Sequence, residues 1–226
     1  VGSEMCIRDR FVGEPFKVFY DYKKEGIWQL GEEAAAAANG QEPGDIKVQD
    51  VDGNGVITTD DRIIYSQRPD VTFGFNNTFN YKGFDLSVFL YARLGQWIAY
   101  DYNTTYRINA LENGGNVDYW TPENPTNAFP RPNKSKSYTQ VTYYSTLKYE
   151  DGSFFKIRDI TLGYTFKPEL LKHLNLSRLR VYATAKNFFT FSKIDNYDPE
   201  QGGSISFPMT KQLVSVSYTH LRAHET

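Results

Sequence analysis

The twelve residues DVDGNGVITTDD, from Asp50 to Asp61, carry the most specific chemistry in this sequence. Oxygen-bearing side chains recur there at the spacing of loops that wrap a calcium ion, with glycine at the sixth position. A hard cation needs six or seven oxygens at about 2.3 to 2.6 Å. The sequence therefore predicts a Ca²⁺ site. The expected ligands are side chains of Asp50, Asp52, Asn54 and Asp61, the hydroxyl of Thr58 or a water beside it, and the carbonyl of Val56.

Two features separate this loop from a helix–loop–helix calcium sensor. Its last position is aspartate, which reaches a cation bidentately less easily than the usual glutamate does. Its flanks, residues 45–49 and 62–65, have the pattern of extended chain rather than of helix. An Asp/Asn/Gly-rich turn that binds no metal explains the same residues, so both interpretations stay open at this point.

Other kinds of chemistry find little support in the composition. The 25 basic and 27 acidic residues are interspersed and give a net charge of -2, without the basic patch of a nucleic-acid-binding protein. No glycine-rich phosphate loop occurs, and nothing singles out two acids as a glycosidase pair. We predict that the protein is not an enzyme and does not bind nucleic acid.

The two ends of the chain differ from its middle. Residues 1–10 (VGSEMCIRDR) and roughly 215–226 (SVSYTHLRAHET) resemble translated adapter sequence rather than strand, helix or signal peptide. We therefore expect foreign sequence at 1–10 and 215–226, and one folded part at 11–214. His173 is then the only histidine outside the ends, and we interpret it as a surface residue.

Alternation of apolar and polar residues predicts two β-hairpins. Apolar residues occupy nearly every second position of 71–81 and 84–93, and Lys82-Gly83 forms a tight turn between these runs. Each run has about the ten residues that a tilted strand needs to cross a bilayer. A second hairpin is predicted over 160–186, with a short connection that begins at Lys167-Pro168.

Weaker strands at 16–29 and 211–214 bring the expected number to about six. Long polar loops would follow Gln29, Tyr100 and Asp195, and the first would contain a short helix at 32–38. Long loops opposite short turns, with aromatic residues beside the turns, are typical of outer-membrane barrels. The predicted fold is all-β: part of a transmembrane antiparallel β-barrel with long extracellular loops and short periplasmic turns. A soluble β-sandwich shows similar alternation and remains an alternative.

Five segments carry a resemblance to a known family. They are GDIKVQDVDGNGVITTDDR (44–62), FGFNNTFNYKGFDLSVFLYARLG (73–95), YWTPENP (119–125), EDGSFFKIRDITLGYTF (150–166) and LRVYATAKNFFTFSKIDNYDPE (179–200). In this order and at these separations, they make the chain resemble the C-terminal part of the SusC/RagA family of TonB-dependent outer-membrane transporters. Residues 11–214 would be part of its barrel.

The resemblance implies a barrel of about 22 strands with a plugged lumen, located in the bacterial outer membrane. It implies import of oligosaccharides or peptides, a SusD-like surface lipoprotein as partner, and TonB contact through an N-terminal region missing from this chain. It transfers no substrate-contacting residue. A secreted, calcium-stabilised carbohydrate-binding β-sandwich remains the first alternative, and a hydrolase fragment the second.

Loop aromatics offer the best hypothesis for contacts with substrate or lipoprotein, because aromatic rings stack on sugars. Tyr119 and Trp120 have a structural alternative, in which they only pin their loop against itself. The candidate contact residues are Tyr119, Trp120, Tyr143 and Tyr144.

Overall fold

The computed structural model describes residues 11–109, 114–172 and 176–221. The first expected foreign segment, 1–10, and the histidine His173 lie outside these residues. The chain forms two compact units. One comprises residues 1–69, 95–151 and 202–206, and the other residues 70–94, 152–201 and 207–226.

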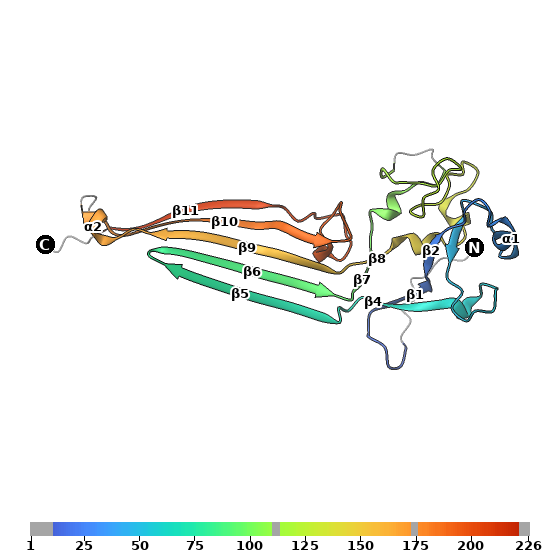
Figure 1. Cartoon of the computed structure of the whole chain (residues 1–226), viewed down its shortest axis with the longest axis horizontal. Helices are drawn as coiled ribbons and strands as arrows, with labels where there is room; N and C mark the ends of the chain where they lie inside the picture. The colour runs from blue at the N-terminus through green and yellow to red at the C-terminus, as the bar shows by residue number, and fades with distance from the viewer. Residues whose placement is uncertain (1–10, 110–113, 173–175, 222–226) are drawn as a thin grey trace. The chain divides into compact units, whose positions relative to one another are not determined.

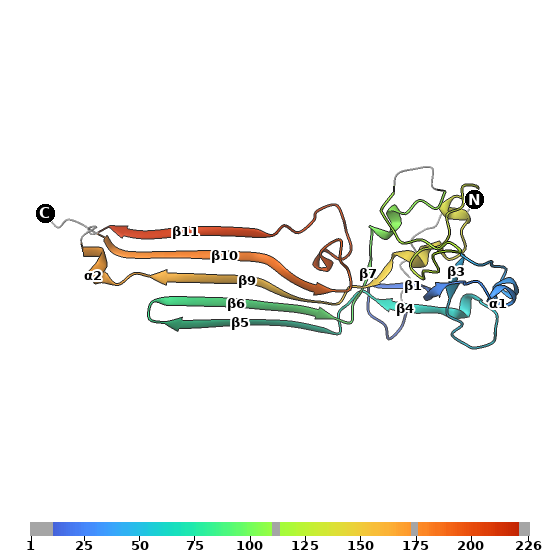
Figure 2. The ribbon, with the colours of Figure 1, turned by 45° about the horizontal axis from the view of Figure 1, so that its top comes forward.

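The second unit is one five-stranded antiparallel sheet with the strand order β11-β10-β9-β6-β5 (Figures 1 and 2). Among the described residues the sheet is open, because β5 and β11 each pair on one side only. The strands span Val71–Tyr81 (β5), Phe84–Leu94 (β6), Phe154–Thr165 (β9), Leu176–Ser192 (β10) and Gln212–Leu221 (β11).

Both predicted hairpins are confirmed. Lys82 and Gly83 connect β5 to β6 with φ angles of 48° and 91°, the left-handed pair that a two-residue hairpin turn requires. Glycine is favoured at the second position, where a Cβ atom would also lie 2.8 Å from the carbonyl oxygen of Thr165. Strands β9 and β10 form the second hairpin, whose connection contains the short helix α2 (Pro168–Leu171).

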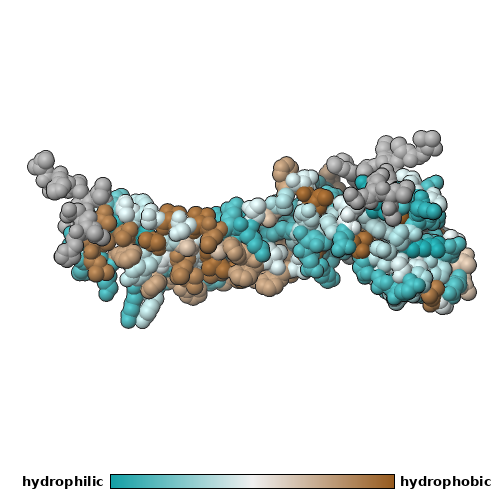
Figure 3. Space-filling view, turned by 90° about the horizontal axis from the view of Figure 1, so that it is seen from above, coloured by the Kyte–Doolittle hydropathy of each residue, from teal (hydrophilic) through white to brown (hydrophobic). Residues whose placement is uncertain are grey.

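The strand register separates an apolar face of the sheet from a polar one, because directly paired residues point to the same side. One row across four strands consists of Phe79, Leu86, Leu162 and Ala183. Phe79 and Leu162 are 62% and 53% exposed. Hydrophobic side chains gather over this unit in Figure 3. The neighbouring row, on the other face, is Thr78, Ser87, Thr161 and Thr184.

Strand β11 breaks this pattern. It continues to Leu221 in register with β10, so the expectation that the last strand is confined to 211–214 is wrong. The 17-residue strand β10 offers a long row of backbone partners, and the residues after 214 include β-favouring Val and Tyr. However, Ser215 extends the apolar row and Val214 extends the polar one.

The described part of the first unit contains three two-stranded sheets. The predicted strand at 16–29 is divided into β1 and β2, which pair with different partners, so the main sheet has five strands rather than the expected six. The pairs are β1 (Val18–Tyr22) with β4 (Arg62–Ser66), β2 (Lys24–Ile27) with β3 (Ile46–Val48), and β7 (Trp97–Ala99) with β8 (Tyr149–Asp151).

Short helices and a small apolar core complete the first unit. The predicted helix in the first loop is confirmed as α1, Glu33–Ala38. Single 3-10 turns lie at Thr59–Asp61 (η1), Asn103–Thr105 (η2), Tyr138–Gln140 (η3) and Tyr144–Lys148 (η4). No helix in the described part of the chain is both long and apolar enough to cross a membrane. The core consists of Ile27, Ile46, Val48, Trp120 and Leu147.

Candidate functional site

The acidic loop from Asp50 to Asp61 lies between β3 and β4, so its flanks are extended as predicted. Carboxylate oxygens of Asp50, Asp52 and Asp61 all lie within 4.8 Å of one another. Asp52 is exposed and Asp50 half-buried, whereas Asp61 is fully buried. Three of the predicted ligands are therefore brought together at the mouth of one turn.

Asp61 closes the loop through its backbone. One carboxylate oxygen accepts a hydrogen bond from the Val51 amide at 2.7 Å, and the other accepts one from the Thr58 amide at 2.7 Å. Thr58 and Asp61 also form a reciprocal cap on the 3-10 turn η1. The bond from Thr58, reinforced by those from Val51 and Asp52, holds the pKa of Asp61 below its usual value.

Asp50 and Asn54 also accept hydrogen bonds from amides of the same loop. Asp50 accepts hydrogen bonds from Gly53 and Gly55 at 2.7 and 2.8 Å, and Asn54 accepts one from Val56 at 2.8 Å. A carboxylate oxygen that accepts one such bond keeps a second lone pair. This geometry fits a cation-binding loop, and it fits a self-satisfied turn equally well.

The four aromatic candidates occupy different environments. Trp120 is only 4% exposed, belongs to the core, and donates its indole N–H to Oε1 of Gln29 at 2.8 Å. The core also approaches Gly44, where a Cβ atom would lie 2.7 Å from the indole ring. Tyr119, its neighbour, is 44% exposed. Trp120 thus anchors the long loop to the β2–β3 hairpin, while Tyr119 faces solvent.

Tyr143 and Tyr144 pack against the same core. Tyr143 has a left-handed backbone, with φ of 64°, and its ring meets that of Tyr22 edge-on at 4.9 Å. The Tyr144 hydroxyl donates a hydrogen bond to the carbonyl oxygen of Tyr106 at 2.5 Å. Contact of any of these tyrosines, or of Trp120, with a substrate or a lipoprotein stays a prediction.

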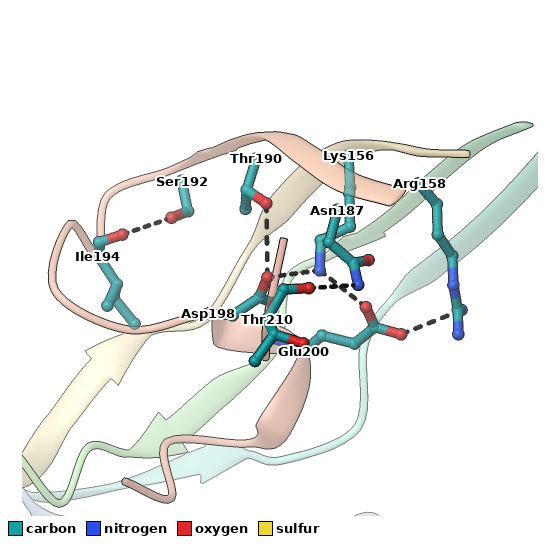
Figure 4. Close-up of polar contacts among 9 residues, drawn as sticks. All are labelled: Lys156, Arg158, Asn187, Thr190, Ser192, Ile194, Asp198, Glu200 and Thr210. Atoms are coloured by element: carbon teal, nitrogen blue, oxygen red, sulfur yellow. Dashed lines mark hydrogen bonds and ion pairs between the residues drawn. The ribbon is translucent and has the colours of Figure 1, made fainter. Parts of the chain in front are cut away.

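The second unit contains a buried ionic cluster that was not predicted from the sequence (Figure 4). Lys156 on β9 is 0% exposed, and its Nζ lies 2.6 Å from Oδ2 of Asp198 and 2.8 Å from Oε2 of Glu200. Arg158 contacts the other oxygen of Glu200 at 3.1 Å. The available signal was the lysine in an otherwise alternating strand, since its partners are more than 40 positions away.

Comparison with known proteins gives named relatives. No family model matches the chain. TonB-dependent receptor P3 of Formosa agariphila is 33% identical over 199 residues, covering 83% of this chain and 19% of the receptor. TonB-dependent receptor P26 of the same organism is 33% identical over 198 residues, with coverages of 84% and 20%. TonB-dependent receptor SusC of Bacteroides thetaiotaomicron is 32% identical over 157 residues, or 67% of this chain and 15% of SusC.

Solved structures show the same fold. The structure of the RagAB peptide transporter matches 89% of this chain and 23% of that chain, with a TM-score of 0.64 and 23% identity. The structure of the RagAB peptide importer in the "open-open" state matches 90% of this chain and 22% of that chain, with a TM-score of 0.60 and 24% identity.

The relatives fix both the family and the extent of the match. The chain spans about a fifth of the length of the curated relatives named here. These relatives carry the name TonB-dependent receptor, and the expectation that the chain is not an enzyme stays a prediction. The chain belongs to the SusC/RagA family of TonB-dependent receptors, of which it represents a segment.

Proposed function

We propose that this segment forms part of the β-barrel wall of an outer-membrane transporter that imports nutrients with energy delivered through TonB. The observation that carries the proposal is the exposed apolar face of β5, β6, β9 and β10, opposite a polar face. Contact of such a face with lipid chains carries no free-energy penalty, whereas its contact with water is unfavourable. A secreted β-sandwich would cover it with a second sheet.

Strand length and aromatic placement support a membrane location. The hairpin strands β5 and β6 have 11 residues each, close to the span of a tilted transmembrane strand. Beside the Lys82-Gly83 turn, the rings of Phe84 and Tyr164 lie 4.6 Å apart, and those of Tyr164 and Phe166 lie 4.9 Å apart. Aromatic belts of this kind mark the boundary between lipid and water.

The face reversal on β11 supports the proposed limit of the barrel part at residue 214. Beyond residue 214, β11 contributes Ser215 and Ser217 to the rows that would face lipid, while its Val216 lies on the polar side. A native strand of a membrane barrel would direct its apolar side chains toward lipid and its polar side chains toward the lumen. We therefore propose that residues 11–214 are barrel sequence and that 215–226 are foreign.

Substrate and partner follow from the family by analogy. The similar structures carry the name RagAB peptide transporter or importer, and SusC is among the relatives. We propose an oligosaccharide or peptide substrate, a SusD-like lipoprotein partner, and TonB contact through a region outside this chain. With two open edges and an unshielded apolar face, the isolated chain should be insoluble without detergent.

The transport proposal is tested with the complete gene that carries this segment. The full-length protein should fractionate with the outer membrane, co-purify with a surface lipoprotein, and support TonB-dependent uptake of labelled oligosaccharides or peptides. Recovery of the full-length protein from the culture medium, with uptake unchanged in a deletion strain, would contradict the proposal.

We also propose that the acidic loop binds Ca²⁺ through Asp50, Asp52 and Asp61, which bring three carboxylates together. Calorimetric titration of the detergent-folded chain with calcium tests this. Asp52→Asn should weaken the binding at least about tenfold, because ligand charge sets calcium affinity. Asp60→Asn, which changes an exposed neighbour that holds no ligand position, should leave it unchanged. Absence of heat at millimolar calcium would mean a metal-free turn.

A further inference from the structure

The nine residues after β10, Lys193 to Gln201, form a compact strap on the sheet (Figure 4). Its Ile194 is 9% exposed and Pro199 is fully buried. The Ser192 hydroxyl donates to the carbonyl oxygen of Ile194 at 2.7 Å, and the Glu200 amide donates to Oδ1 of Asp198 at 3.0 Å. These contacts give the strap a defined conformation.

The strap docks on the polar face of the sheet. Ile157 pairs with Leu90, which continues the apolar side of β6, so the adjacent Lys156 points the other way. Lys156 pairs with Thr190, whose hydroxyl also lies 3.4 Å from Oδ2 of Asp198. Strap and polar face are therefore joined at Lys156.

Lys156 is the anchor of this arrangement. A fully buried ammonium is costly unless opposite charges satisfy it, and both carboxylates that do so belong to the strap. If the strap swung away, one ammonium and two carboxylates would lose their partners together. Arg158, whose side chain is 40% exposed, balances the second carboxylate through Glu200.

We propose that the strap folds into the barrel lumen and narrows the transport path, held there by Lys156. The proposal rests on the proposed function, because the polar face is the lumen side only if the apolar face lies in lipid. The strap lies at the end of the sheet away from the Lys82-Gly83 turn, since Ser192 pairs with Phe154 and Phe154 with Arg93. It places the exposed side chains of Asp195 and Asn196 beside that path.

Hydrogen–deuterium exchange of the detergent-folded chain tests the anchor. Lys156→Met removes the charge while keeping an unbranched side chain, and should speed exchange of strap amides about tenfold or more. Lys82→Met, at an exposed turn of the same sheet, should leave strap exchange unchanged. If Lys156→Met fails to fold, Glu200→Gln, which leaves the Asp198 contact, should produce a smaller increase. Unchanged strap exchange in a folded anchor variant would overturn the proposal.

A spin label tests which side the strap occupies. A cysteine-free variant of the full-length protein that carries this segment is reconstituted in lipid vesicles, with a nitroxide at Asn196 or, for comparison, at Phe191 on the apolar face. The Asn196 label should be reached by a water-soluble nickel complex, and the Phe191 label by oxygen dissolved in lipid. Lipid exposure at both positions would overturn the strap proposal alone. Water exposure at Phe191 would instead overturn the proposed membrane location.

Discussion

The carboxylate of Asp85 on β6 accepts two hydrogen bonds from the guanidinium of Arg180 on β10, at 3.1 and 2.5 Å. The pair reaches over the intervening strand β9, where Gly163 lies directly beneath it. A Cβ atom on Gly163 would lie 2.6 Å from both carboxylate oxygens and 2.8 Å from the guanidinium. One bidentate ion pair thus links β6 to β10 across β9, and only glycine at position 163 leaves room for it.

Gly163→Ala should therefore destabilise the sheet. The added methyl group must displace Asp85 or Arg180, and overpacking of this kind costs about 1 to 3 kcal/mol. The measurement is the urea midpoint of the detergent-folded chain. Gly74→Ala is the matched control, because its Cβ would come no closer than 3.7 Å to the Phe89 ring. Equal midpoints for the two variants would show that the ion pair moves aside without cost.

Trp120→Ala should destabilise the first unit by about 3 to 5 kcal/mol, the usual cost of removing a large buried aromatic. The indole is 4% exposed and donates its N–H to Oε1 of Gln29. In the variant this oxygen would lose its donor. Tyr119→Ala, at the exposed neighbouring position, should cost less than about 1 kcal/mol. Near-ultraviolet circular dichroism during unfolding measures both. A similar, small loss in the two variants would contradict the anchoring role of Trp120.

Asp61 makes the stability of the first unit dependent on pH. Because amide hydrogen bonds, chiefly from Thr58, lower the pKa of Asp61 in the folded state, its stabilising contribution is present above the unfolded pKa of about 3.9. That contribution is lost as the pH falls through the lower, folded pKa. Asp61→Asn should lower stability at pH 7 and flatten this acid limb in unfolding curves at successive pH values. An unaltered acid limb would show that Asp61 is not linked to folding.

Local patterns predicted the parts of the fold that depend on neighbouring residues. Alternation and the Lys82-Gly83 turn located the β5–β6 hairpin, and the same period located β9 and β10. Alternation does not state which strand is the partner. The sequence therefore could not predict that residues 16–29 form two strands, β1 paired with β4 and β2 paired with β3.

The contacts that the sequence did not predict are long-range ones. Lys156 and Asp198 are separated by 42 positions, and Asp85 and Arg180 by 95. The need for glycine at 163 appears only once three strands are aligned. The acidic loop was predictable from its own residues because the hydrogen bonds of its aspartate and asparagine side chains stay within the loop. The same oxygens can close a turn or bind an ion.

Site-directed spin labelling tests most directly whether the apolar face of the sheet lies in lipid. Single nitroxides are placed in a cysteine-free variant of the full-length protein that carries this segment, reconstituted in vesicles. The labelled positions are the paired apolar residues Phe79 and Leu86 and the paired polar residues Thr78 and Ser87. Oxygen from the lipid should reach labels at 79 and 86, while the water-soluble nickel complex should reach those at 78 and 87. Equal access of the nickel complex to all four labels would contradict the barrel-wall account.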